Sequence, residues 1–372
     1  MQNQDNINNI YTIIRELDID GFSSTYLVRN ENNHNQYAAK IMEVDQQLFD
    51  RALQMTTIVS GLNNPNLVHL NGHGNGAITI GGHVQNRNYL ILDYYPKGKL
   101  IDYIHIPGHG FIELHAKYIF DKILRAVQAI HGAGICHRDL ELKNILLDQN
   151  YNPIISNFVL ATNNNVNALN DFVSSKNYSS PQIINHQIYN GFKADIFSLG
   201  VILFNLLTGL MGFKRANIND NLYKLISQQN FNAYWNGLQP YLEVNPSQLF
   251  KDLYVRMVAP NENNRPTIDQ ILQDPWFAQI RNLNNVQQAQ LINQIHNEFV
   301  IRENQINQQN QQNQQNQQNQ QNQQNQQNQQ NQQNQQNQQN QQNQQNQQNQ
   351  QNQQNQQNQQ QENQQNQQQQ NQ

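Results

Sequence analysis

The chain has 372 residues, a formal net charge of −4 and only 13% charged side chains, so it lacks the basic excess of a nucleic-acid-binding protein. Its one cysteine, Cys136, excludes an intrachain disulfide and a zinc site built from cysteines. Residues 1–9 are polar and lack the apolar segment of a signal peptide. We therefore expect a cytoplasmic protein, with the nucleus as an alternative.

The first quarter of the chain is predicted to be rich in strands. We expect residues 1–10 to be disordered. Short β-branched and aromatic runs follow at 26–28, 37–41 and 89–92, separated by polar turns. The stretch 46–62 between them has apolar residues at helical spacing, so it is predicted to be a helix.

Beyond Pro96 the apolar residues recur at helical spacing. Helices are predicted over residues 112–133, 193–209, 219–229, 247–258 and 267–273. The longest apolar stretch, Ile196–Phe213, is interrupted by polar side chains, which favours a buried core helix over a membrane span. A strand-rich part followed by a larger helical part indicates an α+β fold.

Two further segments complete the chain. Residues 281–302 have the pattern of an amphipathic helix, which would pack on the preceding domain or, alternatively, bind a partner. From Asn304 onward, the only residues other than Asn and Gln are Ile306 and Glu362. Because it has almost no apolar surface to offset chain entropy, the tail 303–372 is predicted to be disordered. It is either an expanded repeat without a selected role or a segment through which the chain self-associates.

The strongest functional signal is the segment His137–Asn144, which reads H-R-D-L-E-L-K-N. It resembles the H-R-D-L-x-x-x-N catalytic loop of eukaryotic protein kinases of the Ser/Thr type. Segments similar to other kinase motifs occur in the family's order: Ala38–Lys40, Asn64–Val68, Leu92–Tyr94, Asp195–Gly200, Asn264–Thr267 and Asp274–Phe277. The last is similar to the calcium/calmodulin-dependent and AMP-activated branch. The resemblance implies a two-lobed protein-kinase fold over residues 11–280, with an N-lobe at 11–93 and a C-lobe at 98–280.

The resemblance also implies a nucleotide site. Asp139 would accept the proton of the substrate hydroxyl, and Lys40 would meet the phosphates of ATP. The Mg²⁺ ligands would be Asn144 and Asn157. The remaining nucleotide-binding positions would be Leu17, Thr25, Ala38, Asp93, Tyr95 and Leu146.

Four departures from the family pattern weaken this site. The three glycines of the phosphate loop are replaced by Asp18, Asp20 and Ser23, whose side chains block the approach of phosphate. The helix carboxylate that pairs with Lys40 in the family is replaced by Met55.

The other two departures concern the phosphate and the metal. Glu141 stands where Ser/Thr kinases carry a lysine. Asn157 offers a neutral oxygen where the family has the main Mg²⁺ carboxylate. We therefore expect weak ATP binding at most, and weak metal ligation by Asn144 and Asn157.

These losses favour a Ser/Thr pseudokinase that acts as a nucleotide-binding or scaffolding signalling module with a protein partner. The first alternative is a divergent active Ser/Thr kinase that transfers the γ-phosphate of ATP to a protein substrate. The second is an assembly protein driven by self-association through 303–372. No nucleic-acid or membrane partner is expected.

Overall fold

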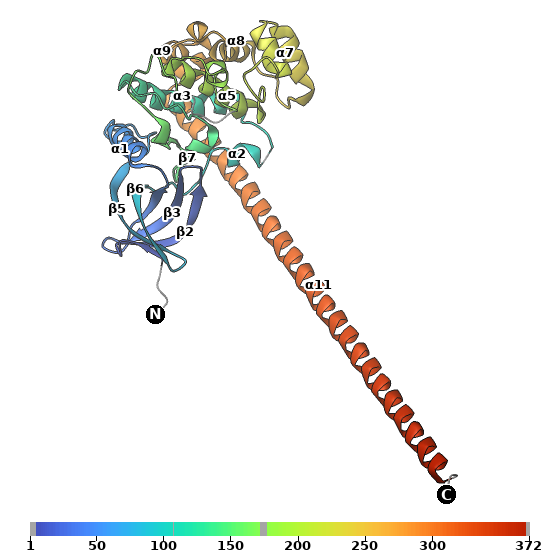
Figure 1. Ribbon diagram of the computed structural model, residues 1–372. Coiled ribbons are helices and arrows are strands. Elements are labelled where there is room, and N and C mark those ends of the chain that lie inside the picture. Colours follow the sequence, from blue (N-terminus) through green and yellow to red (C-terminus); the bar gives the residue numbers. More distant parts are fainter. Residues whose placement is uncertain (1–4, 107, 172–176, 370–372) are drawn as a thin grey trace. The chain divides into compact units, whose positions relative to one another are not determined.

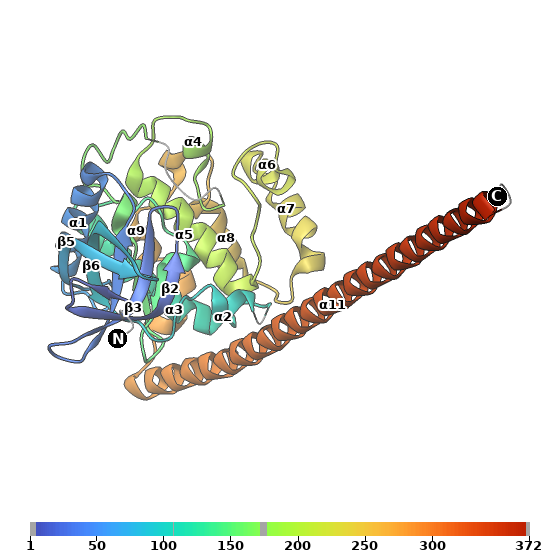
Figure 2. The ribbon, with the colours of Figure 1, turned by 60° about the horizontal axis from the view of Figure 1, so that its bottom comes forward.

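The computed structural model describes residues 5–106, 108–171 and 177–369. Residues 1–306 form one unit of the chain and residues 307–372 form a second. In the first unit the strands and α1 (Gln46–Ser60) lie at one end, and the helices α3 (Glu113–Gly132), α5 (Gly191–Thr208), α8 (Gln248–Met257) and α9 (Ile268–Leu272) gather at the other (Figure 1). Figure 2 shows α6 (Asn221–Ser227) and α7 (Phe231–Leu238) side by side in the helical part. This arrangement agrees with the predicted α+β fold of a small strand-rich part and a larger helical part.

The strand-rich part is a closed antiparallel barrel in the order β1-β2-β3-β4-β6-β5, with β5 returning to β1. Its strands are β1 (Asn6–Ile7), β2 (Tyr11–Ile19), β3 (Ser23–Asn30), β4 (Gln36–Met42), β5 (Leu70–Ile80) and β6 (His83–Asp93). The three predicted runs lie in β3, β4 and β6.

The prediction that residues 1–10 are disordered is corrected by β1. Ile7 is fully buried in the barrel core, opposite Ile78 of β5. Because burying an apolar side chain offsets the entropy of ordering a short segment, this strand is held in place. Residues 1–4 lie outside the described part of the chain.

Strand β5 was not predicted, because three glycines interrupt it and glycine has low strand propensity. At Gly74 the neighbouring strand explains the glycine. A Cβ atom there would lie 2.6 Å from the Tyr89 hydroxyl oxygen, so packing of the Tyr89 side chain requires a residue without a side chain.

Helix α1 begins where predicted, because the Asp45 side chain accepts a hydrogen bond from the backbone N–H of Leu48 at 2.8 Å. It buries Phe49, Met55 and Val59 among other residues. Met55 and Val59 belong to the main core together with Phe158.

The helical part follows the predicted segments closely, each observed end lying within a few residues. Its α-helices are α2 (Asp102–His105), α3 (Glu113–Gly132), α4 (Pro181–Ile184), α5 (Gly191–Thr208), α6 (Asn221–Ser227), α7 (Phe231–Leu238), α8 (Gln248–Met257), α9 (Ile268–Leu272) and α10 (Ala278–Arg281). Short 3₁₀ turns η1 (Leu142–Asn144), η2 (Phe158–Leu160), η3 (Gln239–Tyr241), η4 (Glu262–Asn264) and η5 (Pro275–Phe277), with a two-stranded sheet of β7 (Ile145–Leu147) and β8 (Pro153–Ile155), complete it.

Helix α5 is the predicted buried core helix. It is long and apolar enough to span a membrane, but 89% of its residues are buried inside the protein, as in the central helix of a packed domain. The helix ends at Gly209, which has a left-handed φ of 73°. A Cβ atom there would lie 2.8 Å from backbone atoms of His109 and Gly110, so the turn requires glycine for both reasons.

Helix α11 (Asn285–Gln369) starts inside the first unit. Its first turns bury Leu291, Ile295 and Phe299 in the main core. Of the two predicted roles for residues 281–302, packing on the domain is therefore the observed one. The core extends beyond the predicted boundary at 302, because Ile306 also packs against it.

The tail 303–372, for which the sequence predicts disorder, is drawn as a helix in this structure, because α11 continues to Gln369. The segment has no glycine or proline, and glutamine is a good helix former while asparagine is a moderate one. An α-helix satisfies its backbone hydrogen bonds internally, so it needs no apolar face for that purpose. All side chains from 307 to 361 are exposed.

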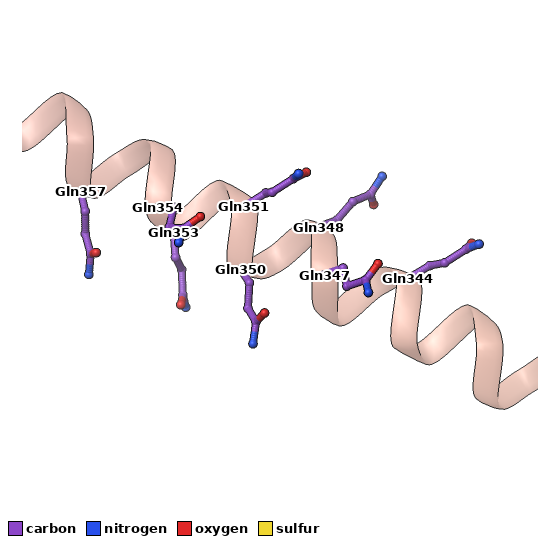
Figure 3. A pocket seen from close by; sticks show the side chains of 8 residues that line it. All are labelled: Gln344, Gln347, Gln348, Gln350, Gln351, Gln353, Gln354 and Gln357. Carbon is purple, nitrogen blue, oxygen red and sulfur yellow. The ribbon is translucent and has the colours of Figure 1, made fainter.

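A shallow hollow on this helix is formed by glutamine side chains alone, which project from successive turns (Figure 3). They are Gln344, Gln347, Gln348, Gln350, Gln351, Gln353, Gln354 and Gln357. Ligand pockets enclose most of a ligand's surface, and one helix cannot do so. The hollow is therefore a surface groove of α11.

Candidate functional site

A cavity of about 140 Å³ lies between the barrel and the helical part. Every nucleotide-binding position expected from the sequence lines it: Leu17, Thr25, Ala38, Lys40, Asp93, Tyr95, Asn144 and Leu146. Strand pairing brings these distant residues together, because Thr25 of β3 lies opposite Lys40 of β4, and Ala38 of β4 lies opposite Leu92 of β6.

Val68 and Ser156 are among the wall residues that were not identified as site residues from the sequence. The backbone N–H of Val68 donates to the Ile155 carbonyl at 3.0 Å, which joins the segment after α1 to β8. Only their positions in the sequence could have indicated that these two residues belong to the site. Val68 is the last residue of the motif Asn64–Val68, and Ser156 directly precedes Asn157.

Lys40 is buried, and its ammonium group has two partners. The Nζ atom donates to Asn157 Oδ1 at 2.9 Å and lies 3.2 Å from Asp20 Oδ2. Burial lowers the pKa of Lys40, and the nearby carboxylates, chiefly Asp20, oppose this shift. Helix α1 presents the core residue Met55 at the position where the family has a carboxylate, so the acidic partner of Lys40 comes from the β2–β3 turn.

The Asp20 carboxylate is held in this position by its own turn. Its Oδ1 atom accepts hydrogen bonds from the backbone N–H of Phe22 at 2.8 Å and from the Ser23 hydroxyl at 3.1 Å. Burial would raise the pKa of Asp20, but the charge of Lys40 and these hydrogen bonds outweigh it and lower the pKa. The carboxylate is therefore ionised and preorganised toward Lys40.

A second ion pair crosses the cavity between β2 and the segment after β6. The Lys99 Nζ atom lies 2.5 Å from Asp18 Oδ1. Both side chains are partly exposed, so the pair adds little stability. Its effect is local, because it places both charged groups at the cavity wall.

Asp139 lies beside the cavity in a network of amides. The Asn144 Nδ2 atom donates to the Asp139 carboxylate and to its backbone carbonyl, both at 2.8 Å. The Asn157 Nδ2 atom donates to Asn144 Oδ1 at 3.1 Å, and it is 3.4 Å from Asp139 Oδ2. Asp139 is thus within reach of both predicted metal-ligand residues.

These residues fit Mg²⁺ poorly. Mg²⁺ prefers carboxylate and water oxygens in octahedral geometry, whereas Asn144 and Asn157 bring at most one neutral oxygen each, and both oxygens already accept hydrogen bonds. Within the described residues, no group of three or more His, Cys, Asp or Glu side chains gathers at any metal-sized site.

Glu141 and Lys143 pair with each other. The Lys143 Nζ atom lies 2.8 Å from Glu141 Oε1, and the Glu141 side chain is buried. Lys143 therefore does not act as a free substitute for the lysine that the family carries at position 141. Its charge is largely neutralised where it lines the cavity.

The loop that carries Asp139 is held in place by the Asp195 side chain of α5. The Asp195 carboxylate accepts from the backbone N–H groups of His137 and Arg138, both at 2.8 Å. The His137 ring contacts the Phe158 ring, with centroids 4.7 Å apart, and its Nε2 bonds the Ser156 carbonyl at 2.9 Å. These contacts fix the loop whether or not chemistry takes place there.

The comparisons with known proteins agree with this geometry. The family described as "Protein kinase domain" matches residues 11–277. The chain is 32% identical over 279 residues to CBL-interacting protein kinase 31 of Oryza sativa subsp. japonica, covering 72% of this chain and 57% of that protein.

Two further relatives are similar. CBL-interacting protein kinase 3 of Oryza sativa subsp. japonica is 31% identical, over 72% of this chain and 58% of its own length. CBL-interacting serine/threonine-protein kinase 26 of Arabidopsis thaliana is 36% identical, over 51% of this chain and 42% of its own length. The chain thus spans about half the length of the relatives it matches.

Proposed function

Because the chain belongs to the protein kinase family, we propose that it is a catalytically impaired member of the Ser/Thr type. It acts as a signalling module that binds a protein partner rather than as an efficient phosphotransferase. The observation that carries this proposal is the state of Lys40, whose ammonium group is bound by Asp20 and Asn157.

The reasoning concerns the delivery of phosphate. Transfer of a phosphoryl group depends on positioning and on charge stabilisation by a lysine and metal ions. Here Lys40 is neutralised by Asp20, Asn157 lacks charge, and Glu141 brings a carboxylate. Removing one positioned transition-state group costs roughly 10²–10³-fold in rate. The losses do not simply multiply, since groups that act as a unit are non-additive.

A phosphotransfer assay on the purified full chain tests this proposal. With radiolabelled ATP, Mg²⁺ or Mn²⁺ and a generic protein substrate, we expect no more incorporation than the Asp139→Asn variant gives. Incorporation that requires the divalent ion and disappears in Asp139→Asn would overturn the proposal.

The same assay decides the second candidate function, a divergent active Ser/Thr kinase. The observation in its favour is the retained loop, in which Asp139 is buried, bonded to Asn144 and anchored through Asp195. Such a kinase would transfer the γ-phosphate of ATP to a protein.

The kind of partner is proposed from chemistry and similarity. The relatives' names describe kinases that interact with CBL, and for this chain we propose a protein partner without specifying it.

Self-association through the Gln/Asn segment is a further candidate, and the structure indicates where a deletion that tests it should begin. Glu303 and Ile306 belong to the first unit and contact its other residues, so the deletion should start at Asn307. Unchanged self-association and localisation after this deletion would exclude the segment as the assembly element.

A further inference from the structure

The cavity is lined by apolar and by charged side chains. Leu17, Ala38, Val68, Leu92 and Leu146 supply the apolar side chains that line it. Its charged side chains include Lys40, Lys99 and Lys143, the only cationic ones among the described residues that line the cavity. These ammonium groups are the cationic partners that the cavity wall offers to a polyphosphate.

Each of the three lysines is already paired with a carboxylate of the chain. Lys40 pairs with Asp20 at 3.2 Å, Lys99 with Asp18 at 2.5 Å, and Lys143 with Glu141 at 2.8 Å.

The Asp20 pair is the most firmly built. The Lys40 side chain is 9% exposed and that of Asp20 is 20% exposed, so water screens this pair little. To reach Lys40, a phosphate group must displace a carboxylate that also accepts two hydrogen bonds from its own turn. If the carboxylate stayed, the phosphate would face a like charge at short range.

The apolar side chains of the cavity can contact a ligand without displacing an ion pair. Its walls come from β2, β4, the segment after α1, β6 and β7, and flat aromatic rings pack well against aliphatic side chains. The volume of about 140 Å³ is below the ~300–1,000 Å³ of pockets that enclose a whole drug-sized ligand. The space therefore suits a small ring system.

We propose that this cavity binds an uncharged, nucleobase-sized heterocycle and that the Asp20 carboxylate, paired with Lys40, is the residue that rejects nucleoside polyphosphates. The inference rests on the proposed function, since it assigns a ligand to a site that does not transfer phosphate. Adenine and adenosine are the probes, because they carry a flat ring without phosphate.

Binding of adenine, adenosine, ADP and ATP to the full chain, with and without Mg²⁺, tests the inference by calorimetric titration. For the wild type we expect adenine or adenosine to bind at least about tenfold more tightly than ATP. In Asp20→Asn, whose amide can still accept from Phe22 and Ser23, ATP affinity should rise about tenfold or more, while adenosine affinity changes less than about threefold.

Glu16→Gln is the matched control. Glu16 lies on β2, the strand that leads into the turn with Asp20, is exposed and does not line the cavity, so this variant removes one negative charge without freeing Lys40. Its ATP affinity should remain at the wild-type value. If Asp20→Asn does not fold, Asp18→Asn takes its place and should raise ATP affinity by freeing Lys99.

Three results would overturn the inference: ATP binding as tight as adenosine binding in the wild type, no binding of adenine or adenosine, or an unchanged ratio of ATP to adenosine affinity in the variant. None of these requires phosphotransfer. Mg²⁺-dependent phosphotransfer would instead overturn the proposed function, so the two failures are distinguishable.

Discussion

At the residue scale, Lys40 at the cavity and Arg302 on α11 both have partners from other elements of the fold. Lys40 of β4 meets Asp20 of the β2–β3 turn. On α11, Arg302 is almost fully buried, and its guanidinium donates to the backbone carbonyls of Tyr103, His109 and Gly110 and to the Glu298 carboxylate. A buried guanidinium group stabilises the fold only while all its hydrogen-bond partners remain in place.

Replacing Arg302 by Met should therefore destabilise the protein strongly. The substitution leaves three carbonyls and the Glu298 carboxylate without this donor, and we expect a loss of about 3 kcal/mol or more in the free energy of unfolding. Urea unfolding followed by tryptophan fluorescence measures the loss. The neighbouring Ile301 side chain is 60% exposed, so Ile301→Ala should stay within about 0.5 kcal/mol. Equal effects of the two variants would contradict the assignment.

Glu298 predicts a pH dependence of stability. Burial would raise the pKa of Glu298, but hydrogen bonds from His115 and Arg302 and their charges outweigh it, so the pKa lies below the ordinary value of 4.5. A lowered carboxyl pKa contributes stability that is fully present above about pH 4.5 and lost as pH falls through the folded-state pKa. Urea unfolding between pH 7 and pH 3 should therefore show a steeper acid loss for the wild type than for Glu298→Gln. Parallel curves for the two proteins would contradict this.

At the element scale, the first turns of α11 form part of the core of the first unit. The Phe299 ring lies between Tyr103, Phe111 and Tyr151, with ring centroids 5.1–5.4 Å away. Next along the helix, Glu303 pairs with Lys97 at 2.9 Å. Lys97 belongs to the segment that joins the barrel to the helical part, so α11 also contacts the connection between the two parts.

The aromatic contacts of α11 predict a matched pair of variants. Phe299→Ala should lower the free energy of unfolding by about 3–5 kcal/mol, because it removes a fully buried ring and leaves a cavity. Val300→Ala, one residue further on, truncates a side chain that is 36% exposed and should cost far less. Denaturant unfolding of both variants measures the difference. A cost below about 1 kcal/mol for Phe299→Ala would refute the packing of this helix.

At the scale of the whole molecule, the core ends with the first unit. The described side chains after Ile306 are all exposed, so removal of residues 307–372 takes no buried apolar area away. Removal from Asn285 onward also deletes Leu291, Ile295 and Phe299 from the core.

Two truncations therefore have opposite expected results. A chain ending at Ile306 should melt within about 2 °C of the full chain, since its core is intact. A chain ending at Asn284 should melt far lower or fail to fold, because the apolar surface under α11 becomes exposed. Differential scanning calorimetry compares the three proteins. A large drop for the chain ending at Ile306 would contradict the boundary.

Local patterns predicted most of the fold. Helices α1, α3 and α5 were predicted to within a few residues at each end, because caps and apolar periodicity act over short stretches of chain. Strands β1, β2, β5, β7 and β8 and helix α7 were missed. The pairing of β1 depends on the burial of one residue, Ile7, and the glycine-rich β5 depends on Tyr89 of the next strand, so neither has a local signal.

The residues of the candidate site could also be predicted from local sequence, whereas their ion-pair partners could not. Its residues could be named from the sequence because they stand in motifs of fixed spacing, and the cavity gathers all eight expected nucleotide-binding positions. The replacement of the usual carboxylate by Met55 was equally visible. The acidic partner of Lys40 could not be predicted, because Asp20 is twenty residues away in the sequence and lies in the β2–β3 turn. The pairing of Lys143 with Glu141 was likewise seen only in the structure.

The sequence by itself determined the family, the order of the elements and the identity of the groups around the cavity, because motifs and periodicity are local properties of the chain. Only the tertiary structure decided which charges neutralise one another and where the core ends. Ion pairing depends on distances of a few ångströms between atoms of different elements, and burial depends on what covers a side chain. The pairing of Lys40 with Asp20 and the packing of Phe299 against Tyr151 therefore exist only in the folded chain.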